Sequence, residues 1–408
     1  MFAAHTMRRM GIRLRAIEAS RKGSPVPRVL LVSNYGSFGG GGAAVFRDIA
    51  LALREKRPDI DVVGVYPWKG NLAAECARHG VRTKIGFTPW WAFSKRLPTP
   101  RIEALIGALP YGALLLLGIL QALWLLVRLR PTMVITNTMV IPSHAVAAKL
   151  LGIPHYWNVL EFGTDDHRLR FLFGYRRSIR LIGQLSDSVI CLSQAVEKAM
   201  LALDPKMKTF QVYPVVDTPL GTPPERHPGE AMRAVLVGRF APSKGQHLAI
   251  EAVAIARKAG VDIELALVGA AGSNDKALHQ LARRLGVEDL VSIHKPTARD
   301  VACYWSAAHV GLMCSECEAF GLVTVEAMRA GLPVCGTNAG GTPEIIDPGV
   351  NGLLSPAGDA NALAANLMAL ESDEDLRRSL AFRAVETTQR FQRDNRYGDE
   401  LTAILGLC

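Results

Sequence analysis

The sequence alternates short apolar segments with longer segments of helical character, and it does so in two successive series. In the first series, strand-like segments are expected at Val29–Ser33, Val62–Tyr66, Met133–Thr136, His155–Val159 and Ser188–Leu192. The second series has strand-like segments at Ala234–Val237, Glu264–Val268, Val291–His294, Val310–Cys314, Pro333–Gly336 and Gly352–Leu354. Strands that alternate with helices form parallel sheets covered by helices on both faces. The pattern therefore predicts an α/β protein with two doubly wound, Rossmann-like domains.

A proline-rich segment separates the two series. Five prolines interrupt all periodicity between residues 214 and 228, as in a linker between domains. The chain of 408 residues also exceeds the usual size of a single core. We therefore predict a basic segment at 1–27, an N-terminal domain at 28–213, a linker at 214–228 and a C-terminal domain at 229–390.

The formal charge of +10 is concentrated at the N-terminus. Residues 1–28 hold seven lysines and arginines against the single Glu18, and Met7, Met10, Leu14 and Ile17 fall at helical spacing. This pattern fits a basic helix on an anionic membrane, and a solvated terminus fits equally well. No apolar region with a cleavage site follows, so we expect a cytoplasmic protein without a secretory signal.

A second apolar stretch runs from Leu109 to Val127 and approaches the length of a membrane span. A span would place the strands at Val29 and Met133 on opposite sides of the membrane, and Pro110 and Gly112 are expected to disturb its start. The stretch is instead expected to be buried or partly sunk into a lipid surface. Peripheral contact with the inner face of the cell membrane is therefore one of two open interpretations.

Glycine-rich and charged loops follow several of the predicted strands. Gly40 and Gly41 lie in the glycine-rich turn Asn34–Gly42 before a helix, where backbone amides can approach an anion, although the turn lacks a dinucleotide fingerprint. Arg239 and Lys244 share the loop after the first strand of the second domain. Ligands of open α/β sheets bind at the carboxyl ends of the strands, where a diphosphate could neutralise both cations.

The segment Ser315–Pro333 contains the most informative pattern. Glu318 lies in a turn with Phe320, Gly321 and Leu322, and Glu326 follows on a short helix. The helix start offers amides to an anion, and the two carboxylates can accept hydrogen bonds from sugar hydroxyls. The next segment, Asn338–Ile346, again places glycines before a helical start.

These motifs together resemble the retaining, metal-independent group 1 glycosyltransferases of GT-B type, in which two Rossmann-like domains face each other across a cleft. The resemblance rests on Gly238-Arg239, Lys244-Gly245, the Glu318-x7-Glu326 pair and Gly340–Glu344. It implies that Arg239 and Lys244 hold the diphosphate of a nucleotide-sugar donor, that Glu318 contacts the sugar and that Glu326 contacts the ribose. It also implies no metal and no further cofactor, and a last helix at 391–408 that returns to the N-terminal domain.

The first domain matches this family less well. Leu160 and Glu161 stand where the family commonly has a His followed by an acid. Glu161 is therefore our candidate for orienting the acceptor or the donor sugar, with a plain surface carboxylate as the alternative. The sequence does not identify the acceptor. The arginine-rich run from His167 to Arg180 suits a lipid-linked phosphate or a solvated helix face, and no nucleic acid is expected.

Other functions remain as alternatives to sugar transfer. The missing His raises the possibility of a donor-binding but catalytically inactive partner subunit of a transferase. A phosphorylase or epimerase on the same scaffold and a dinucleotide-dependent oxidoreductase are the enzymatic alternatives. The seven scattered cysteines are read as reduced core residues, and the Cys314-x-x-Cys317 spacing has no second pair to complete a zinc site.

Overall fold

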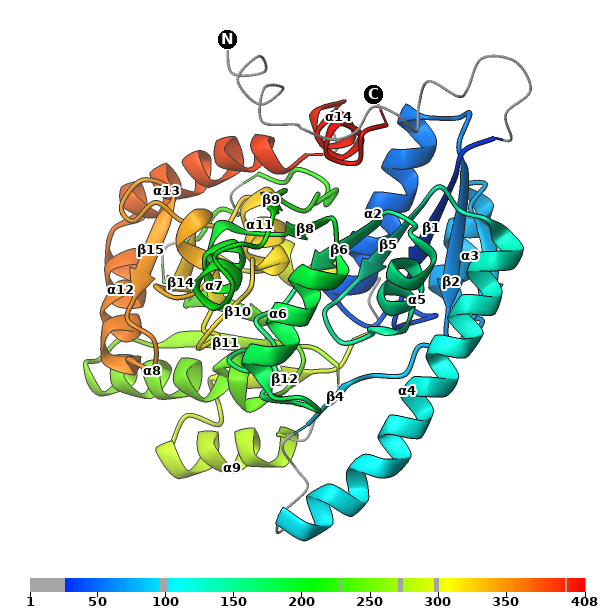
Figure 1. Ribbon diagram of the computed structural model, residues 1–408. Coiled ribbons are helices and arrows are strands. Elements are labelled where there is room, and N and C mark those ends of the chain that lie inside the picture. The colour runs from blue at the N-terminus through cyan, green and yellow to red at the C-terminus, as the bar shows by residue number, and fades with distance from the viewer. Residues whose placement is uncertain are drawn as a thin grey trace.

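The computed structural model describes residues 26–94, 101–222, 224–227, 229–270, 274–296, 301–392 and 395–407. It contains two parallel sheets, each covered by helices on both faces (Figure 1). This is the predicted α/β fold class, with two doubly wound domains of GT-B type.

The N-terminal domain is built on a seven-stranded parallel sheet in the order β3-β2-β1-β5-β6-β8-β9. Its strands are β1 (Arg28–Val32), β2 (Asp61–Tyr66), β3 (Arg82–Ile85), β5 (Met133–Asn137), β6 (His155–Val159), β8 (Ser188–Cys191) and β9 (Thr209–Gln211). Strands β4 (Ala92–Ser94) and β7 (Leu169–Phe171) form a separate antiparallel pair. The helices are α2 (Gly41–Lys56), α3 (Asn71–Arg78), α4 (Arg101–Leu129), α5 (Ser143–Leu151), α6 (Tyr175–Leu185) and α7 (Gln194–Leu203).

The C-terminal domain is built on a six-stranded parallel sheet in the order β12-β11-β10-β13-β14-β15. Its strands are β10 (Met232–Val237), β11 (Ile263–Val268), β12 (Val291–His294), β13 (Val310–Met313), β14 (Val334–Thr337) and β15 (Gly352–Ser355). Its helices are α8 (Gln246–Lys258), α9 (Asp275–Leu285), α10 (Val301–Ala307), α11 (Leu322–Arg329), α12 (Ala360–Ser372) and α13 (Glu374–Thr387). Short 3₁₀ turns lie at η2 (Pro242–Lys244), η4 (Thr342–Glu344) and η5 (Thr388–Phe391).

Both faces of each sheet are buried, which explains why the strands read as continuous apolar runs. In β1, Val29 and Leu31 pack on one face of the sheet, and Leu30 and Val32 pack on the other. The cluster that contains Leu30 also includes Phe320 of the C-terminal domain. One apolar cluster therefore continues from the first domain into the second.

The last helix, α14 (Asn395–Ile404), lies against α2 of the N-terminal domain. Leu401 and Ile404 belong to the same apolar cluster as Val29 and Leu31. Lys56 on α2 forms an ion pair with Asp399 on α14, with 2.5 Å between Nζ and Oδ1. The chain thus returns from the second domain to the first, where Figure 1 shows α14 beside α2.

Two features of the N-terminal domain differ from the sequence analysis. Helix α4 runs from Arg101 to Leu129 and passes through Pro110 and Gly112, which we expected to disturb its start. A proline removes one backbone hydrogen bond and crowds the carbonyl group four residues earlier, and α4 continues through Pro110 despite this cost. The arginine-rich run is also not one helix, because β7 occupies Leu169–Phe171 and α6 begins only at Tyr175.

Candidate functional site

The loops singled out in the sequence follow the carboxyl ends of β1, β6, β10, β13 and β14, and they meet where the two domains touch. The Oγ of Ser193 in the first domain donates a 2.5 Å hydrogen bond to the carbonyl oxygen of Ala319 in the second. Arg168 lies 3.5 Å from Glu316 across the same junction. A Cβ on Gly41 would lie 2.7 Å from the Leu322 side chain. The glycine-rich turn of the first domain therefore faces the start of α11 in the second.

Lys244 and Glu318, which the sequence places 74 residues apart, form an ion pair. The Nζ of Lys244 lies 2.6 Å from Oε2 of Glu318, and the Ser315 hydroxyl donates to the same oxygen over 3.0 Å. Both side chains are partly exposed. Arg239, on the same loop as Lys244, is exposed and forms no ion pair with any residue of the described ranges. The site therefore has one cation balanced by a carboxylate and one cation open to a ligand.

Glycines allow the C-terminal loops to approach each other this closely. Gly340 has a φ of +59°, and a Cβ there would lie 2.2 Å from the carbonyl oxygen of Glu318. The amide of Gly341 donates a 2.7 Å hydrogen bond to that same oxygen. The turn of Gly340 and Gly341 thus fixes the backbone that carries Glu318.

Helix α11 begins beside this ion pair. Its N-cap is Gly321, with a φ of 102°, and Leu322 is its first residue. The first amides of a helix have no partner within the helix and carry partial positive charge, so they favour an anion. Phe320 is fully buried just before them and anchors the turn, with its ring 5.2 Å from that of Phe391.

Glu326 lies on α11, and its carboxylate has no hydrogen-bonding partner among the residues that the structure describes. It is only partly accessible to solvent, and burial raises the pKa of its carboxyl group. A carboxylate in this setting can accept hydrogen bonds from ligand hydroxyls without first breaking an ion pair. Its position suits the predicted contact with a ribose.

Glu161 is buried at the end of β6, so it is not the surface carboxylate that the sequence left as an alternative. Its Oε1 accepts hydrogen bonds from the Thr138 hydroxyl and, over 2.9 Å, from the Met139 amide. Its Oε2 accepts the Leu160 amide over 3.1 Å. Thr138 has a φ of 87°, which is strained for a residue other than glycine, and its carbonyl oxygen accepts the Trp157 indole N–H. Glu161 therefore holds the loop after β5 in shape.

Burial raises the pKa of Glu161 from 4.5 to about 7, although its hydrogen bonds act in the opposite direction. The folded protein then keeps a proton on this carboxyl group that the unfolded chain releases, so the group's contribution to stability falls as pH rises from 4.5 to about 7. We expect Glu161→Gln to remove this fall. Thermal unfolding midpoints of the parent and of Glu161→Gln, measured across that pH range, test this expectation. If the two midpoints changed with pH in parallel, the expectation would be contradicted.

Two polar groups, Tyr35 and Glu344, make contacts at the junction that the sequence does not reveal. Tyr35 lies just before Gly36, and burial together with the charge of Glu161 raises the pKa of its hydroxyl, while the charge of Arg239 lowers it. Tyr35 therefore lies within electrostatic range of a group from each domain. Glu344 accepts hydrogen bonds from the amides of Gln194 and Ala195, over 2.9 and 2.7 Å, at the start of α7. Neither contact could be foreseen, because each depends on how the domains meet.

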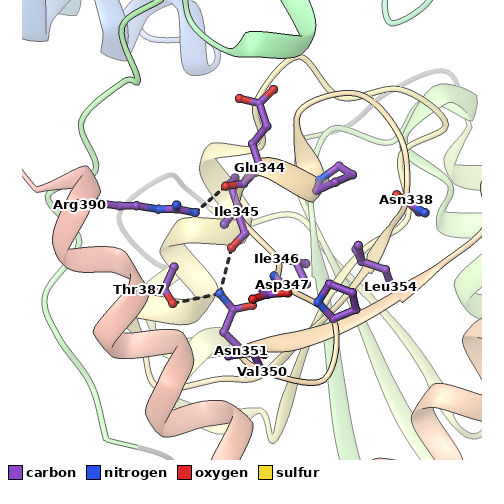
Figure 2. A pocket seen from close by; sticks show the side chains of 12 residues that line it. Asn338, Glu344, Ile345, Ile346, Asp347, Val350, Asn351, Leu354, Thr387 and Arg390 are labelled. Carbon is purple, nitrogen blue, oxygen red and sulfur yellow. Dashed lines mark hydrogen bonds between the residues drawn. The ribbon is translucent and has the colours of Figure 1, made fainter.

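The pocket shown in Figure 2 lies between the loop that follows β14 and the end of α13. It has a volume of about 480 Å³, and Glu344, Asn351 and Arg390 are among the side chains that line it. Asn351 donates hydrogen bonds of 3.0 Å to the Ile345 carbonyl and to Thr387, which ties η4 to α13. Its lining includes none of Arg239, Lys244 and Glu318. It is thus separate from the candidate site.

The comparisons with known proteins agree with this arrangement. Residues 223–386 match the family model described as "Glycosyl transferases group 1". A glycosyltransferase of Methanocaldococcus jannaschii is 26% identical over 253 residues, which cover 61% of this chain and 68% of that protein. A D-inositol 3-phosphate glycosyltransferase of Kribbella flavida is 34% identical over 183 residues, 43% of this chain, and the match spans only 42% of its length.

Among solved structures, HepE of Anabaena in complex with UDP and glucose superposes with a TM-score of 0.71. The likeness covers 94% of this chain and 100% of HepE, at 22% identity, and therefore concerns the fold. Three observations indicate the same family. They are the two doubly wound domains, the cationic loops at their junction and the family match over the second domain. Residues 223–386 thus match the group 1 glycosyltransferases, and the whole chain shares its fold with HepE.

Proposed function

We propose that this protein transfers a sugar from a nucleoside-diphosphate sugar to an acceptor hydroxyl, with retention at the sugar carbon. The observation that supports this most is the grouping of Arg239, Lys244 and the first amides of α11 at the domain junction. Together they form a preorganised environment for a diphosphate. HepE, which shares the fold, has been crystallised with UDP-glucose.

Each group has a defined task in this proposal. Arg239, Lys244 and the amides at Leu322 stabilise the negative charge that grows on the leaving diphosphate as the bond to the sugar carbon breaks. Glu318 contacts the sugar and Glu326 the ribose. Gly40 and Gly41 bring the turn of the first domain up to the donor from the opposite side. The acceptor oxygen then bonds to the sugar carbon and gives its proton to the departing diphosphate.

The ion pair of Lys244 and Glu318 would change partners when a donor binds. The carboxylate of Glu318 compensates the ammonium of Lys244 over 2.6 Å. A diphosphate carries more negative charge and can take over Lys244, which frees Glu318 to accept hydrogen bonds from sugar hydroxyls. Glu161 acts as a positioning residue in this proposal, because its oxygens are occupied by the loop after β5.

Donor binding should raise the thermal unfolding midpoint of the protein. A ligand present at about 100 times its Kd stabilises the folded state by about 2.7 kcal/mol. We expect members of a nucleotide-sugar panel, with UDP-glucose included, to produce this shift, and the free nucleoside to produce none. Arg239→Ala should diminish the shift, whereas Arg284→Ala, on α9 in the same domain, should preserve it. A panel without any stabilising member would contradict the proposal.

A second candidate function is a donor-binding subunit that is catalytically inactive. The observation in its favour is Leu160 at the position where the family commonly has His, followed by a Glu161 whose carboxylate is turned into the domain. A donor hydrolysis assay, with Glu318→Ala as its control, separates the two functions. Slow release of free sugar that Glu318→Ala abolishes supports the transferase, and donor binding without any release supports the inactive subunit.

The acceptor is proposed by class only. Arg176, Arg177 and Arg180 are exposed on α6 of the N-terminal domain, and Arg168 and Arg170 are exposed just before it. Such a group of guanidinium side chains suits a phosphate, which favours a lipid-linked acceptor over a neutral polysaccharide.

A further inference from the structure

Helix α4 exposes an apolar face on the outside of the N-terminal domain. Figure 1 shows the helix along the outer edge of that domain. Within the described residues, Tyr111–Leu129 is the one stretch long and apolar enough to cross a membrane, with a mean hydropathy of 2.0 and about 33% of it buried. The outward side chains are more than half exposed: Leu116 57%, Leu117 56%, Leu120 54%, Trp124 57% and Val127 60%.

The opposite face of α4 belongs to the domain core. Leu115, Ala122, Leu125, Leu126 and Leu129 are buried in the same cluster as Leu30. A Cβ on Gly118 would meet Pro89 and Ser143 at less than 3 Å, so the helix lies tightly on α5. Because this face is needed to cover the sheet, α4 cannot leave the domain to span a bilayer. Any contact of α4 with a lipid surface would therefore be made by its outer face alone.

The apolar surface continues onto the neighbouring helix. Leu150 is 67% exposed and Leu151 is 39% exposed at the end of α5, which packs against α4. We call these two leucines and the five outward residues of α4 the α4 surface. Exposed apolar side chains gathered in this way are typical of an interaction site.

The charges around the α4 surface are positive. Residues 111–130 contain no Asp or Glu, and their only charges are Arg128 and Arg130 at the end of the helix. The Arg128 guanidinium lies over the Trp124 ring, 5.3 Å from its centre. Lys149 is exposed beside Leu150. Tryptophan and arginine at the edge of an apolar surface suit the interfacial layer of a membrane.

Residues 1–25 of the basic N-terminal segment lie outside the described residues, which begin at this same end of α4. The Arg28 guanidinium donates a hydrogen bond to the Leu129 carbonyl, and the Thr132 amide donates over 2.8 Å to the Arg28 carbonyl. Asp61 already pairs with Arg28, so the remaining attraction comes from the six lysines and arginines that precede it, against Glu18 alone. The described residues therefore begin beside the end of α4 that carries Arg128 and Arg130.

We propose that the α4 surface is a membrane-docking site, seated in the interfacial layer of an anionic bilayer and reinforced by the basic segment 1–27. The anionic inner leaflet of the cell membrane has the matching charge. A second copy of the chain is the less favoured occupant, because two such surfaces would bring like charges together at Arg128 and Arg130.

This docking would also serve the proposed transfer, a point that rests on the proposed function. Helix α4 leads into β5, and as a crossover between parallel strands it runs opposite to β5. Its N-terminal end therefore lies on the side of the sheet where β5 and β6 end and the loops of Thr138 and Glu161 begin. A bilayer along α4 would present a lipid-linked acceptor near that edge.

Vesicle binding tests the proposal without any nucleotide or acceptor. We expect the full chain to co-sediment with vesicles of equal parts phosphatidylglycerol and phosphatidylcholine, and much less with phosphatidylcholine alone. The double variant Leu120→Glu and Trp124→Glu should lower the bound fraction at least tenfold. Val350→Glu and Phe382→Glu are matched controls, since both replace exposed apolar residues of the C-terminal domain, and they should bind as the parent does.

Two further measurements keep the test decisive. Deleting residues 1–22 should weaken vesicle binding mainly at low salt. Brominated lipids should quench the tryptophan fluorescence of the parent far more than that of Trp124→Phe. An unchanged thermal unfolding midpoint shows that the double variant is folded. Vesicle binding by the double variant equal to that of the parent would overturn the proposal. A dimer in solution that the double variant converts to a monomer would overturn it in favour of a second copy.

Discussion

Lys244→Ala is expected to lower kcat/KM by about 10²- to 10³-fold, the usual cost of removing one charged or polar group that stabilises a developing anion. Lys244 is placed for this task by η2, and its ammonium group is held 2.6 Å from Glu318. Negative charge on the diphosphate is greatest as it leaves the sugar, and the Lys244 ammonium group stabilises it most at that point. We therefore expect kcat to fall as well as the affinity for donor. Initial rates over a range of nucleotide-sugar concentrations measure both effects.

The control for Lys244 is a lysine of the same domain that is remote from the junction. Lys258 ends α8 and is exposed, and Lys258→Ala should keep kcat/KM within about twofold of the parent. Since Lys244→Ala also leaves Glu318 without its partner, thermal unfolding must show that the variant is folded. If a folded Lys244→Ala kept its turnover within threefold of the parent, the assignment of the diphosphate site would have to be given up.

Strands that are buried on both faces could be located from the sequence. Short strands at the edges of the sheet could not. The segment at His155–Val159 was predicted with its observed bounds, because the aromatic Tyr156 and Trp157 and the β-branched Val159 favour a strand. Strands β3 and β9 lie at the two edges of the first sheet, where Arg82 and Lys84 can remain exposed and no apolar run is needed. The short antiparallel pair of β4 and β7 depends on a partner 77 residues away, so no local pattern reveals it.

Residue types at the site could be predicted from the sequence, and their partners could not. Cations after β10 and carboxylates around α11 follow from the rule that ligands bind at the carboxyl ends of strands. The pairing of Lys244 with Glu318 depends on how Gly340 and Gly341 support the second loop. Glu161 was even harder to place, because a polar residue in a loop signals exposure unless the donors that surround it are known.

Gly245→Ala is expected to cost about 2–5 kcal/mol of stability and to disturb the donor site at the same time. Gly245 links η2 to α8 with a φ of +68°, and a Cβ there would lie 1.9 Å from the backbone carbonyl oxygen of Cys314. The left-handed conformation costs a residue with a side chain about 1–2 kcal/mol, and the overlap with rigid backbone adds about 1–3 kcal/mol. Relief of the overlap must move either Lys244 or the loop of Ser315 and Glu318, so the ion pair cannot stay as it is.

Gly286→Ala separates these two causes. Gly286 ends α9 with a φ of +70°, nearly the same as that of Gly245, and a Cβ there would have no atom within 4 Å. This variant should therefore show only the conformational cost of about 1–2 kcal/mol and should keep its donor affinity. Thermal unfolding and nucleotide-sugar titration of both variants give the comparison. The two variants could instead lose equal amounts of stability and both keep their donor affinity. Close contact between the Lys244 and Glu318 loops would then not be the reason for glycine at position 245.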